Sequence, residues 1–330
     1  MRRAPFVVAA ALLLSSADAQ AYLKLGSVIG GNVVSLKWGS FPIRYFITNR
    51  DVPGVTAPQF RDAVGRAFAT WEAVPNTGMS STFAGFTQAS PLDDDNMNVI
   101  GFANRPDLDR VLGSTSFTLD VISGQIIESD IFLNSSFVWS VAANGQQQVF
   151  DVESIALHEI GHLHGLGHSA LGETELMGGD RLVLAAEAVM FPIAFSAGSV
   201  NARTLRADDI AGISDLYGNT TFRGETGSIS GHVTKNGAGL FGAHIVAFSP
   251  STGKLVGGFS LEDDGSYVIA GLEPGPQVVR VEPLDDADID SFFDTSADVD
   301  LDFKPTFSTQ LVFVPRGGTA GNVDLKVVPK

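Results

Sequence analysis

The amino-acid sequence predicts an α+β domain built on a twisted sheet, followed by a small all-β sandwich. Up to Gly218, segments with helical periodicity alternate with segments in which apolar and polar residues alternate. After Gly218, short β-rich runs separated by Gly, Pro, Asp and Asn take over, without helical periodicity. The polar, Gly-containing segment 219–227 is interpreted as a linker between domains at 20–222 and 223–330. A chain cut in this linker is therefore expected to keep a folded and functional first domain.

The first domain begins with an expected strand over 38–48, where apolar and polar residues alternate. A helix over 56–73 follows, which Thr56 can cap and which has Pro58 in its first turn. One stripe of large apolar residues along this helix indicates a face that packs on the core: Phe60, Val64, Phe68 and Trp71.

Two further helices are expected in the first domain. Asp151 can cap one that ends near His164, and the other covers 207–217, with Gly218 after its last turn. Short β-rich runs, between the helices and in the second domain, predict strands over 96–103, 111–118, 125–133, 228–233, 243–249, 266–270, 278–281, 309–314 and 321–328.

Composition excludes several classes of function. The 330 residues carry a net charge of −16, and a chain this acidic repels the phosphates of nucleic acids. The sequence has no cysteine, so disulfides, thiolate metal ligands and cysteine nucleophiles are all excluded. The hydrophobic share of 44% is enough for packed cores and excludes a disordered chain.

The N-terminus has the features of a cleaved signal peptide over 1–19. Arg2 and Arg3 precede an apolar run over 6–14, and Ala17-Asp18-Ala19 has the small-x-small pattern of a cleavage site. The apolar run is far shorter than the roughly 20 residues of a membrane span. We therefore expect export, to the medium or the cell envelope, of a mature chain that starts near Gln20 and has no membrane span.

The most informative segment is 158–168, with the sequence HEIGHLHGLGH. His158 and His162 are four residues apart, so on a helix their side chains lie one above the other and can bind one ion. Gly165 permits the left-handed turn that ends the helix, after which the chain can bring His168 round as a third ligand. Three neutral imidazoles leave the fourth position of a zinc ion open for water, as in catalytic rather than structural sites.

Two other side chains of this segment have different expected roles. Glu159 lies next to the first ligand and can reach a metal-bound water, so we expect it to act on that water. His164 points to another face of the helix and is expected to be a packed or exposed histidine rather than a ligand.

The segment resembles the long zinc signature of the metzincins, H-E-x-x-H-x-x-G-x-x-H. Ser169, directly after the third histidine, is the residue that the matrixin branch, that of the matrix metalloproteinases, carries there. The resemblance covers roughly 38–218. It implies a metzincin-type catalytic domain with an active-site helix. It also implies a zinc metalloendopeptidase that hydrolyses protein or peptide substrates with a zinc-activated water and Glu159 as general base.

The same family has a methionine turn beneath the zinc, for which two residues compete. Met177 is close to His168, at the separation usual for matrixins. Met190 is farther along but precedes Phe191-Pro192, which matches the local Met-aromatic-Pro pattern. We choose Met190, which implies that 170–187 contains an insertion and that 191–194 would wall the substrate pocket.

The sequence also departs from the family pattern. Matrixins usually carry a second, structural zinc, but the corresponding strand, 128–139, contains no histidine. We therefore expect one catalytic zinc ion. Calcium is not favoured, because the run Asp93-Asp94-Asp95, which could hold a cation, is better explained as a solvated acidic loop. The cysteine that keeps many matrixins latent is absent too.

The C-terminal part resembles a carboxypeptidase regulatory-like, or prealbumin-like, β-sandwich. The matching residues are turn glycines and strand starts, in the segments 227–233, 242–243, 264–267 and 271–275. His232 and His244 are expected to be strand residues rather than ligands. An alternative function is a non-catalytic surface adhesion or matrix-binding protein that uses this sandwich and has a vestigial zinc site. The intact ligands and base favour the enzyme, which we expect to be a monomer.

Overall fold

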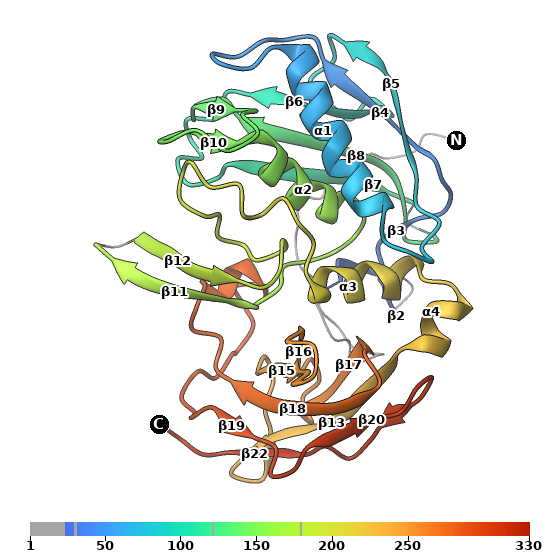
Figure 1. Cartoon of the computed structure of the whole chain (residues 1–330), viewed down its shortest axis with the longest axis vertical. Coiled ribbons are helices and arrows are strands. Elements are labelled where there is room, and N and C mark those ends of the chain that lie inside the picture. Colours follow the sequence, from blue (N-terminus) through green and yellow to red (C-terminus); the bar gives the residue numbers. More distant parts are fainter. Residues whose placement is uncertain (1–23, 30–31, 121, 179) are drawn as a thin grey trace. The chain divides into compact units, whose positions relative to one another are not determined.

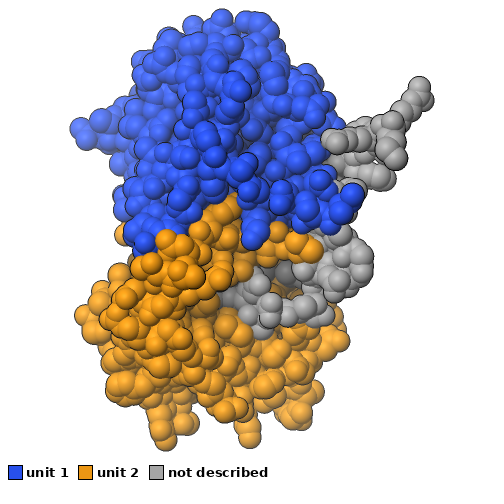
Figure 2. Space-filling view, turned by 90° about the vertical axis from the view of Figure 1, so that its right-hand side faces the viewer, with its two compact units in different colours: residues 1–11, 36–165, 194–204 blue, residues 12–35, 166–193, 205–330 orange. Residues whose placement is uncertain are grey.

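The computed structural model describes residues 24–29, 32–120, 122–178 and 180–330. The expected signal peptide, 1–19, and the expected cleavage point before Gln20 lie outside the described residues. No helix in the described part of the chain is long and apolar enough to cross a membrane. The chain divides into two compact units, coloured separately in Figure 2.

The two compact units do not coincide with the expected domains 20–222 and 223–330. Within the described residues, the first unit comprises 36–165 and 194–204. The second unit comprises the N-terminal segment before residue 36, the segment 166–193, and everything from 205 to 330. Parts of the expected first domain therefore group with the β-rich C-terminal part.

A six-stranded sheet forms the centre of the first unit. Its order is β3-β8-β6-β4-β5, and β7 pairs with β8. The pairs β4·β5, β4·β6 and β6·β8 are parallel, whereas β7 runs antiparallel to β8, its one partner among the described strands. The strands are β3 (Lys37–Trp38), β4 (Ile43–Thr48), β5 (Ser81–Thr87), β6 (Asn98–Ala103), β7 (Gly113–Leu119) and β8 (Gln125–Asn134). The short strands β9 (Trp139–Ser140) and β10 (Phe150–Asp151) form a separate parallel pair.

Two helices of the first unit lie side by side, α1 (Ala57–Glu72) and α2 (Val152–Leu163) (Figure 1). Thr56 caps α1 in a capping box with Gln59, as the sequence predicts, and the predicted apolar stripe is buried. The indole of Trp71 donates a hydrogen bond of 2.8 Å to the carbonyl of Leu157. This bond ties α1 to the middle of α2.

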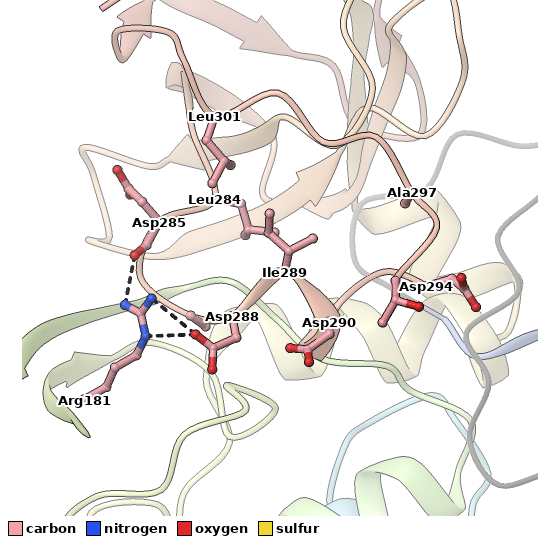
Figure 3. A pocket seen from close by; sticks show the side chains of 11 residues that line it. Arg181, Leu284, Asp285, Asp288, Ile289, Asp290, Asp294, Ala297 and Leu301 are labelled. Carbon is pink, nitrogen blue, oxygen red and sulfur yellow. Dashed lines mark hydrogen bonds and ion pairs between the residues drawn. The ribbon is translucent and has the colours of Figure 1, made fainter. Parts of the chain in front are cut away.

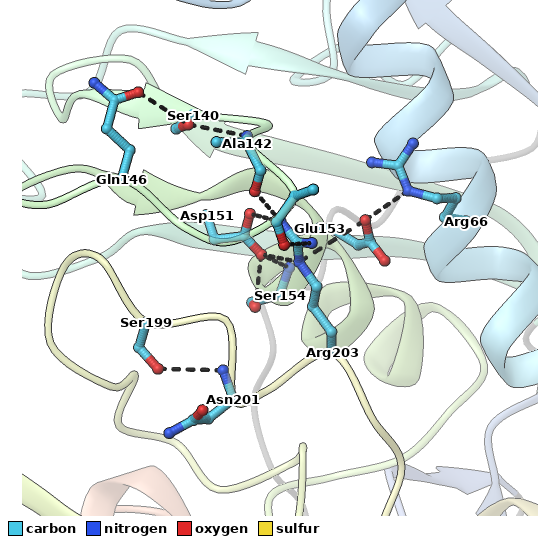
Figure 4. A network of polar contacts seen from close by, with 11 residues as sticks. Arg66, Ser140, Ala142, Gln146, Asp151, Glu153, Ser154, Ser199, Asn201 and Arg203 are labelled. Carbon is cyan, nitrogen blue, oxygen red and sulfur yellow. Dashed lines mark hydrogen bonds and ion pairs between the residues drawn. The ribbon is translucent and has the colours of Figure 1, made fainter.

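The start of α2 is held by a network of charged side chains (Figure 4). Asp151 caps the helix as predicted, and Arg203 donates to both of its carboxylate oxygens, at 2.6 and 2.8 Å. Arg203 also donates to the carbonyl of Ala142 at 2.8 Å. Two residues along, Glu153 accepts a bond of 2.6 Å from Arg66 of α1. A buried carboxylate with a bidentate arginine partner fixes the position of α2 more firmly than a cap alone.

The second unit contains two five-stranded sheets. In one, β13 (Gly227–Lys235) pairs with β14 (Ala238–Gly239), β17 (Ser266–Leu272), β21 (Thr319–Ala320) and β22 (Leu325–Val327). The other sheet has the order β16-β15-β18-β19, and β20 also pairs with β18. Its strands are β15 (His244–Phe248), β16 (Leu255–Phe259), β18 (Gly275–Glu282), β19 (Thr306–Phe307) and β20 (Val312–Val314). His232 and His244 lie in β13 and β15, as predicted.

The remaining elements of the second unit are two helices, two hairpins and one short 3-10 turn. They are α3 (Ala207–Tyr217), α4 (Thr220–Glu225), the hairpin β1 (Gly26–Ile29) and β2 (Asn32–Ser35), the hairpin β11 (Gly172–Met177) and β12 (Asp180–Ala186), and η1 (Ile289–Ser291). The bounds of α3 are those predicted. The expected linker 219–227 contains the short helix α4, which Asn219 caps by accepting a bond of 2.9 Å from the amide of Thr221.

Helix α3 packs directly on strands of the C-terminal part. The amide of Gly257 in β16 donates a bond of 2.8 Å to Asp208 at the start of α3. A Cβ atom on Gly271 of β17 would stand 2.8 Å from that of Ala211, so only glycine permits this approach. Leu171 and Ala188 share a buried cluster with Val246 of β15. The first part therefore shares packing contacts with strands of the C-terminal part. These contacts argue against a functional first part after a cut in 219–227, and that expectation stays a prediction.

Candidate active site

Two of the expected ligands face each other on α2. The Nε2 atoms of His158 and His162 are 3.1 Å apart, and their rings stand edge to face with centroids 4.7 Å apart. Two nitrogens that bind one tetrahedral zinc ion at about 2.0–2.1 Å stand roughly 3.3 Å apart. The spacing on the helix therefore fits one shared zinc ion.

His168 completes a group of three histidines. The ligand nitrogens of His158, His162 and His168 all lie within 4.8 Å of one another. Helix α2 ends at Leu163, and Gly165 takes a left-handed conformation with φ of 97°, as its position predicts. Burial lowers the pKa of His168, and its hydrogen bond to a backbone carbonyl opposes that shift. The result favours the neutral imidazole, which is the form that binds a metal ion.

Glu159 is buried, with 5% of its surface exposed, and lies between the two helical histidines along the chain. The hydroxyl of Thr115 in β7 donates a hydrogen bond of 2.7 Å to its Oε2 atom. Burial raises the pKa of Glu159 to about 7, and the Thr115 bond acts in the opposite direction. A carboxyl group with this pKa can both accept and donate a proton near neutral pH.

The strand β7 shapes the surroundings of Glu159. A Cβ atom on Gly113 would stand only 2.8 Å from Oε1 of Glu159, so any larger residue there would displace the carboxylate. The roles of Gly113 and Thr115 are not predicted from the sequence. The chain itself gives no local signal for them, because they lie more than 40 residues from Glu159 and meet it only in the fold.

Replacing Thr115 by Val should lower kcat/KM for peptide cleavage by about 10- to 100-fold, because one hydrogen bond to a carboxylate contributes about 1.5–3 kcal/mol. Valine has the shape of threonine but no hydroxyl. Thr115→Ser should keep most of the activity. Steady-state kinetics on a fluorogenic peptide give the comparison. Thr118→Val is the matched control, since the hydroxyl of Thr118 donates to Asp94 instead. Equal losses of kcat/KM in Thr115→Val and Thr118→Val would show that Thr115 does not act through Glu159.

His164 is packed rather than solvated. Its ring lies with 1% exposure and its centroid is 6.3 Å from the rings of Phe68 and Trp71. Burial lowers its pKa to about 3, so the ring is neutral at physiological pH. Its role is that of a core residue between α1 and the end of α2.

The two candidate methionines differ sharply in environment. Met190 is 2% exposed, and its carbonyl accepts a bond of 2.9 Å from the amide of Ser169, which follows the third histidine. Met177 is 57% exposed and lies in β11. The expected insertion in 170–187 contains the β11–β12 hairpin. This arrangement supports the choice of Met190.

We expect Met190→Ala to reduce the free energy of unfolding by about 2–5 kcal/mol and to weaken zinc retention, because it opens a cavity beside the ligand turn. Met190→Leu conserves volume and should cost less than about 1.5 kcal/mol. Chemical denaturation and residual zinc after dialysis measure both effects. Met177→Ala, on the exposed hairpin, should change neither. The choice of Met190 fails if Met177→Ala is the damaging change.

Two buried aspartates at the start of α3 contact the chain around Met190 and the residue that follows His168. Asp209 accepts bonds of 2.9 and 3.1 Å from the amides of Val189 and Met190. Burial raises the pKa of Asp209 to about 6, although these bonds favour its charged form. Burial likewise raises the pKa of Asp208 to about 7, which a hydrogen bond with Ser169 opposes. Both aspartates therefore connect α3 to the segment that carries His168.

Comparison with known proteins decides the family. The matrixin family model matches residues 37–218, which is more than half of the chain. This chain belongs to the matrixin family. Metalloendoproteinase 1 of Glycine max is 31% identical over 178 residues, which are 48% of this chain and 46% of that protein. Metalloendoproteinase 2-MMP of Arabidopsis thaliana is 30% identical over 184 residues, which are 51% of this chain and 40% of that protein.

The match to these plant matrixins is partial, since the aligned part of the chain spans less than half the length of either relative. Among solved structures, the Bacillus anthracis TIE protein aligns with 32% of this chain and 17% of that chain. Its TM-score is 0.19 at 17% identity, which is too low to indicate a shared fold. The family assignment therefore rests on the matrixin match.

Proposed function

We propose that this matrixin is a secreted zinc metalloendopeptidase with His158, His162 and His168 as zinc ligands and Glu159 as general base. The observation that carries the proposal is the group of three histidine nitrogens within 4.8 Å of one another, on a matrixin signature with its acidic residue intact. Three imidazoles suit zinc and leave one position open. We expect one catalytic zinc ion per chain.

The reaction follows from the chemistry of the residues. Zinc, when bound, would supply a Lewis acid that polarises the attacking water and the scissile carbonyl. Glu159 accepts a proton from the water and then donates it to the nitrogen of the leaving amine. Its raised pKa suits both steps, and Thr115 holds the carboxylate in one orientation.

Substrate is proposed to lie along β7 as an extended strand. β7 is antiparallel to β8 and has no other partner among the described strands, so its outer backbone groups can pair with a peptide. The sequence predicts a strand here, over 111–118. Gly113 and Thr115 of the same strand contact the region of Glu159, which would bring the scissile bond to the base.

Three further features belong to the same proposal. The first 19 residues would direct export and be removed. Residues 223–330 would be a carboxypeptidase regulatory-like β-sandwich, which two packed five-stranded sheets would form. The partners would be protein or peptide substrates, with a monomer as the working form.

A zinc-loaded sample incubated with a mixed peptide library tests the proposal, with products identified by mass spectrometry. We expect internal cleavage that stops when a chelator is added and returns with zinc. The alternative, an adhesion protein with a vestigial site, predicts no cleavage of any peptide. The absence of cleavage in a sample shown to contain zinc would reject the peptidase.

A further inference from the structure

We propose that the C-terminal part of the chain holds the third zinc ligand in place, through the backbone carbonyl of Ser291 and the ring of Phe292. This inference rests on the proposed function, because it assigns His168 to the zinc ion. It gives the β-rich part a direct role at the metal site rather than that of an appended module. It also gives the β11–β12 hairpin a role, as the element that supports Ser291.

The first contact is a hydrogen bond on the far side of the ligand ring. Nδ1 of His168 lies 2.6 Å from the carbonyl oxygen of Ser291 at the end of η1. A carbonyl oxygen only accepts, so Nδ1 carries the hydrogen and donates. Nε2 then keeps its lone pair, which is what a metal ligand needs. Such outer hydrogen bonds fix the ring of a metal-binding histidine, and their loss typically weakens metal affinity 10–100-fold.

The second contact is with the next residue. The ring of Phe292 stands edge to face with the His168 ring, with centroids 6.3 Å apart and an interplanar angle of 78°. Phe292 is fully buried, and it also packs against Phe259 of β16, at 5.8 Å between centroids. The orientation of His168 is therefore set by residues that the strands of the C-terminal part hold in place.

The β11–β12 hairpin ties down the loop that leads into η1. Thr174 of β11 donates its amide and its hydroxyl to the side chain and carbonyl of Asp286, at 2.8 and 2.7 Å. Arg181 of β12 donates to the carbonyl of Asp285 at 3.0 Å and pairs with Asp288 at 3.5 Å (Figure 3). These bonds fix both backbone and side chains of 285–288. The hairpin therefore supports the turn that presents the Ser291 carbonyl.

Two adjacent phenylalanines provide a matched test. Phe292 contacts His168, whereas Phe293, 1% exposed, packs against Phe241 and Phe259, at 5.3 and 5.4 Å between ring centroids. Truncating either to Ala removes a buried ring of the same size from neighbouring positions. A loss of stability alone should therefore affect the two variants alike.

The experiment measures the zinc dissociation constant of the full chain by competition with a chromophoric chelator, alongside the thermal midpoint. We expect Phe292→Ala to raise the zinc dissociation constant 10–100-fold. Phe293→Ala should lower the thermal midpoint to a similar extent but change zinc affinity less than about threefold. Phe292→Leu, which restores an apolar contact, should recover part of the affinity. If Phe292→Ala does not fold, Arg181→Ala on the hairpin should still raise the dissociation constant several-fold.

The inference is overturned if Phe292→Ala, or Arg181→Ala in its place, binds zinc as tightly as the wild type. It is also overturned if Phe293→Ala weakens zinc binding equally. The wild-type chain separates these results from failure of the proposed function. A wild type that binds zinc but cleaves no peptide removes the peptidase and leaves the positioning role, whereas a wild type that binds no zinc overturns both.

Discussion

Glu159→Gln is expected to lower peptide-bond hydrolysis by about 10³-fold or more while leaving zinc affinity unchanged, because an amide cannot accept the proton of the attacking water. Glutamine has the shape of glutamate, and its oxygen can still accept the hydrogen bond from Thr115. The fold around α2 should therefore persist. Single-turnover cleavage of a fluorogenic peptide, with zinc measured in the same sample, separates loss of chemistry from loss of metal.

The matched control is Glu175→Gln, which makes the same change at an exposed position of β11. It should cleave like the wild type. Glu159 would not be the base if its Gln variant cleaved at a rate near that of the wild type. If the variant lost zinc together with activity, the loss could not be assigned to proton transfer, and the role given to Glu159 would not survive.

Ending the chain after Glu225 is expected to abolish soluble, zinc-binding protein. The cut removes the strands against which α3 packs, and it leaves Asp208 without the amide of Gly257. Leu171 and Ala188 lose Val246 and become exposed apolar surface beside the ligand segment. Soluble yield, far-ultraviolet circular dichroism and zinc content of the shortened chain give the answer. Co-expression of residues 226–330 as a separate chain should restore part of the soluble protein.

A shortened chain that folds, binds zinc and cleaves peptides would contradict this expectation and support the boundary that the sequence suggests. That boundary is suggested by a polar segment between two patterns of different periodicity. The change from helical periodicity to short β-rich runs is present in the structure, since α3 is the last long helix among the described residues. Such a change in sequence pattern does not show which elements pack together, however, and α3 buries one face against β16 and β17.

Local signals predicted the helices well. A capping box at Thr56 and the cap at Asp151 place the starts of α1 and α2, and the apolar stripe of α1 gives its buried face. The histidine spacing places two ligand nitrogens 3.1 Å apart, which follows from helix geometry alone. These features depend on residues within one or two turns of each other.

The sequence was less informative where distant segments meet. It did not indicate that Thr115 would hold Glu159, or that Ser291 would contact His168, 123 residues away along the chain. The contacts of Thr115 with Glu159 and of Ser291 with His168 join residues far apart in sequence, so no local propensity or periodicity encodes them. Two local elements were also not predicted from the sequence. One is the short helix α4, and the other is β5, a strand of mostly half-buried residues that contains Gly85 with a positive φ.

Elemental analysis of the purified, dialysed full-length protein tests the central claim most directly. The account predicts about one zinc ion per chain in the wild type, and far less than one in a His158→Ala, His162→Ala double variant that keeps its secondary structure. The metal count depends on the group of three histidines and not on the choice of substrate. A wild type without zinc, two tightly held zinc ions per chain, or full zinc content in the double variant would contradict it.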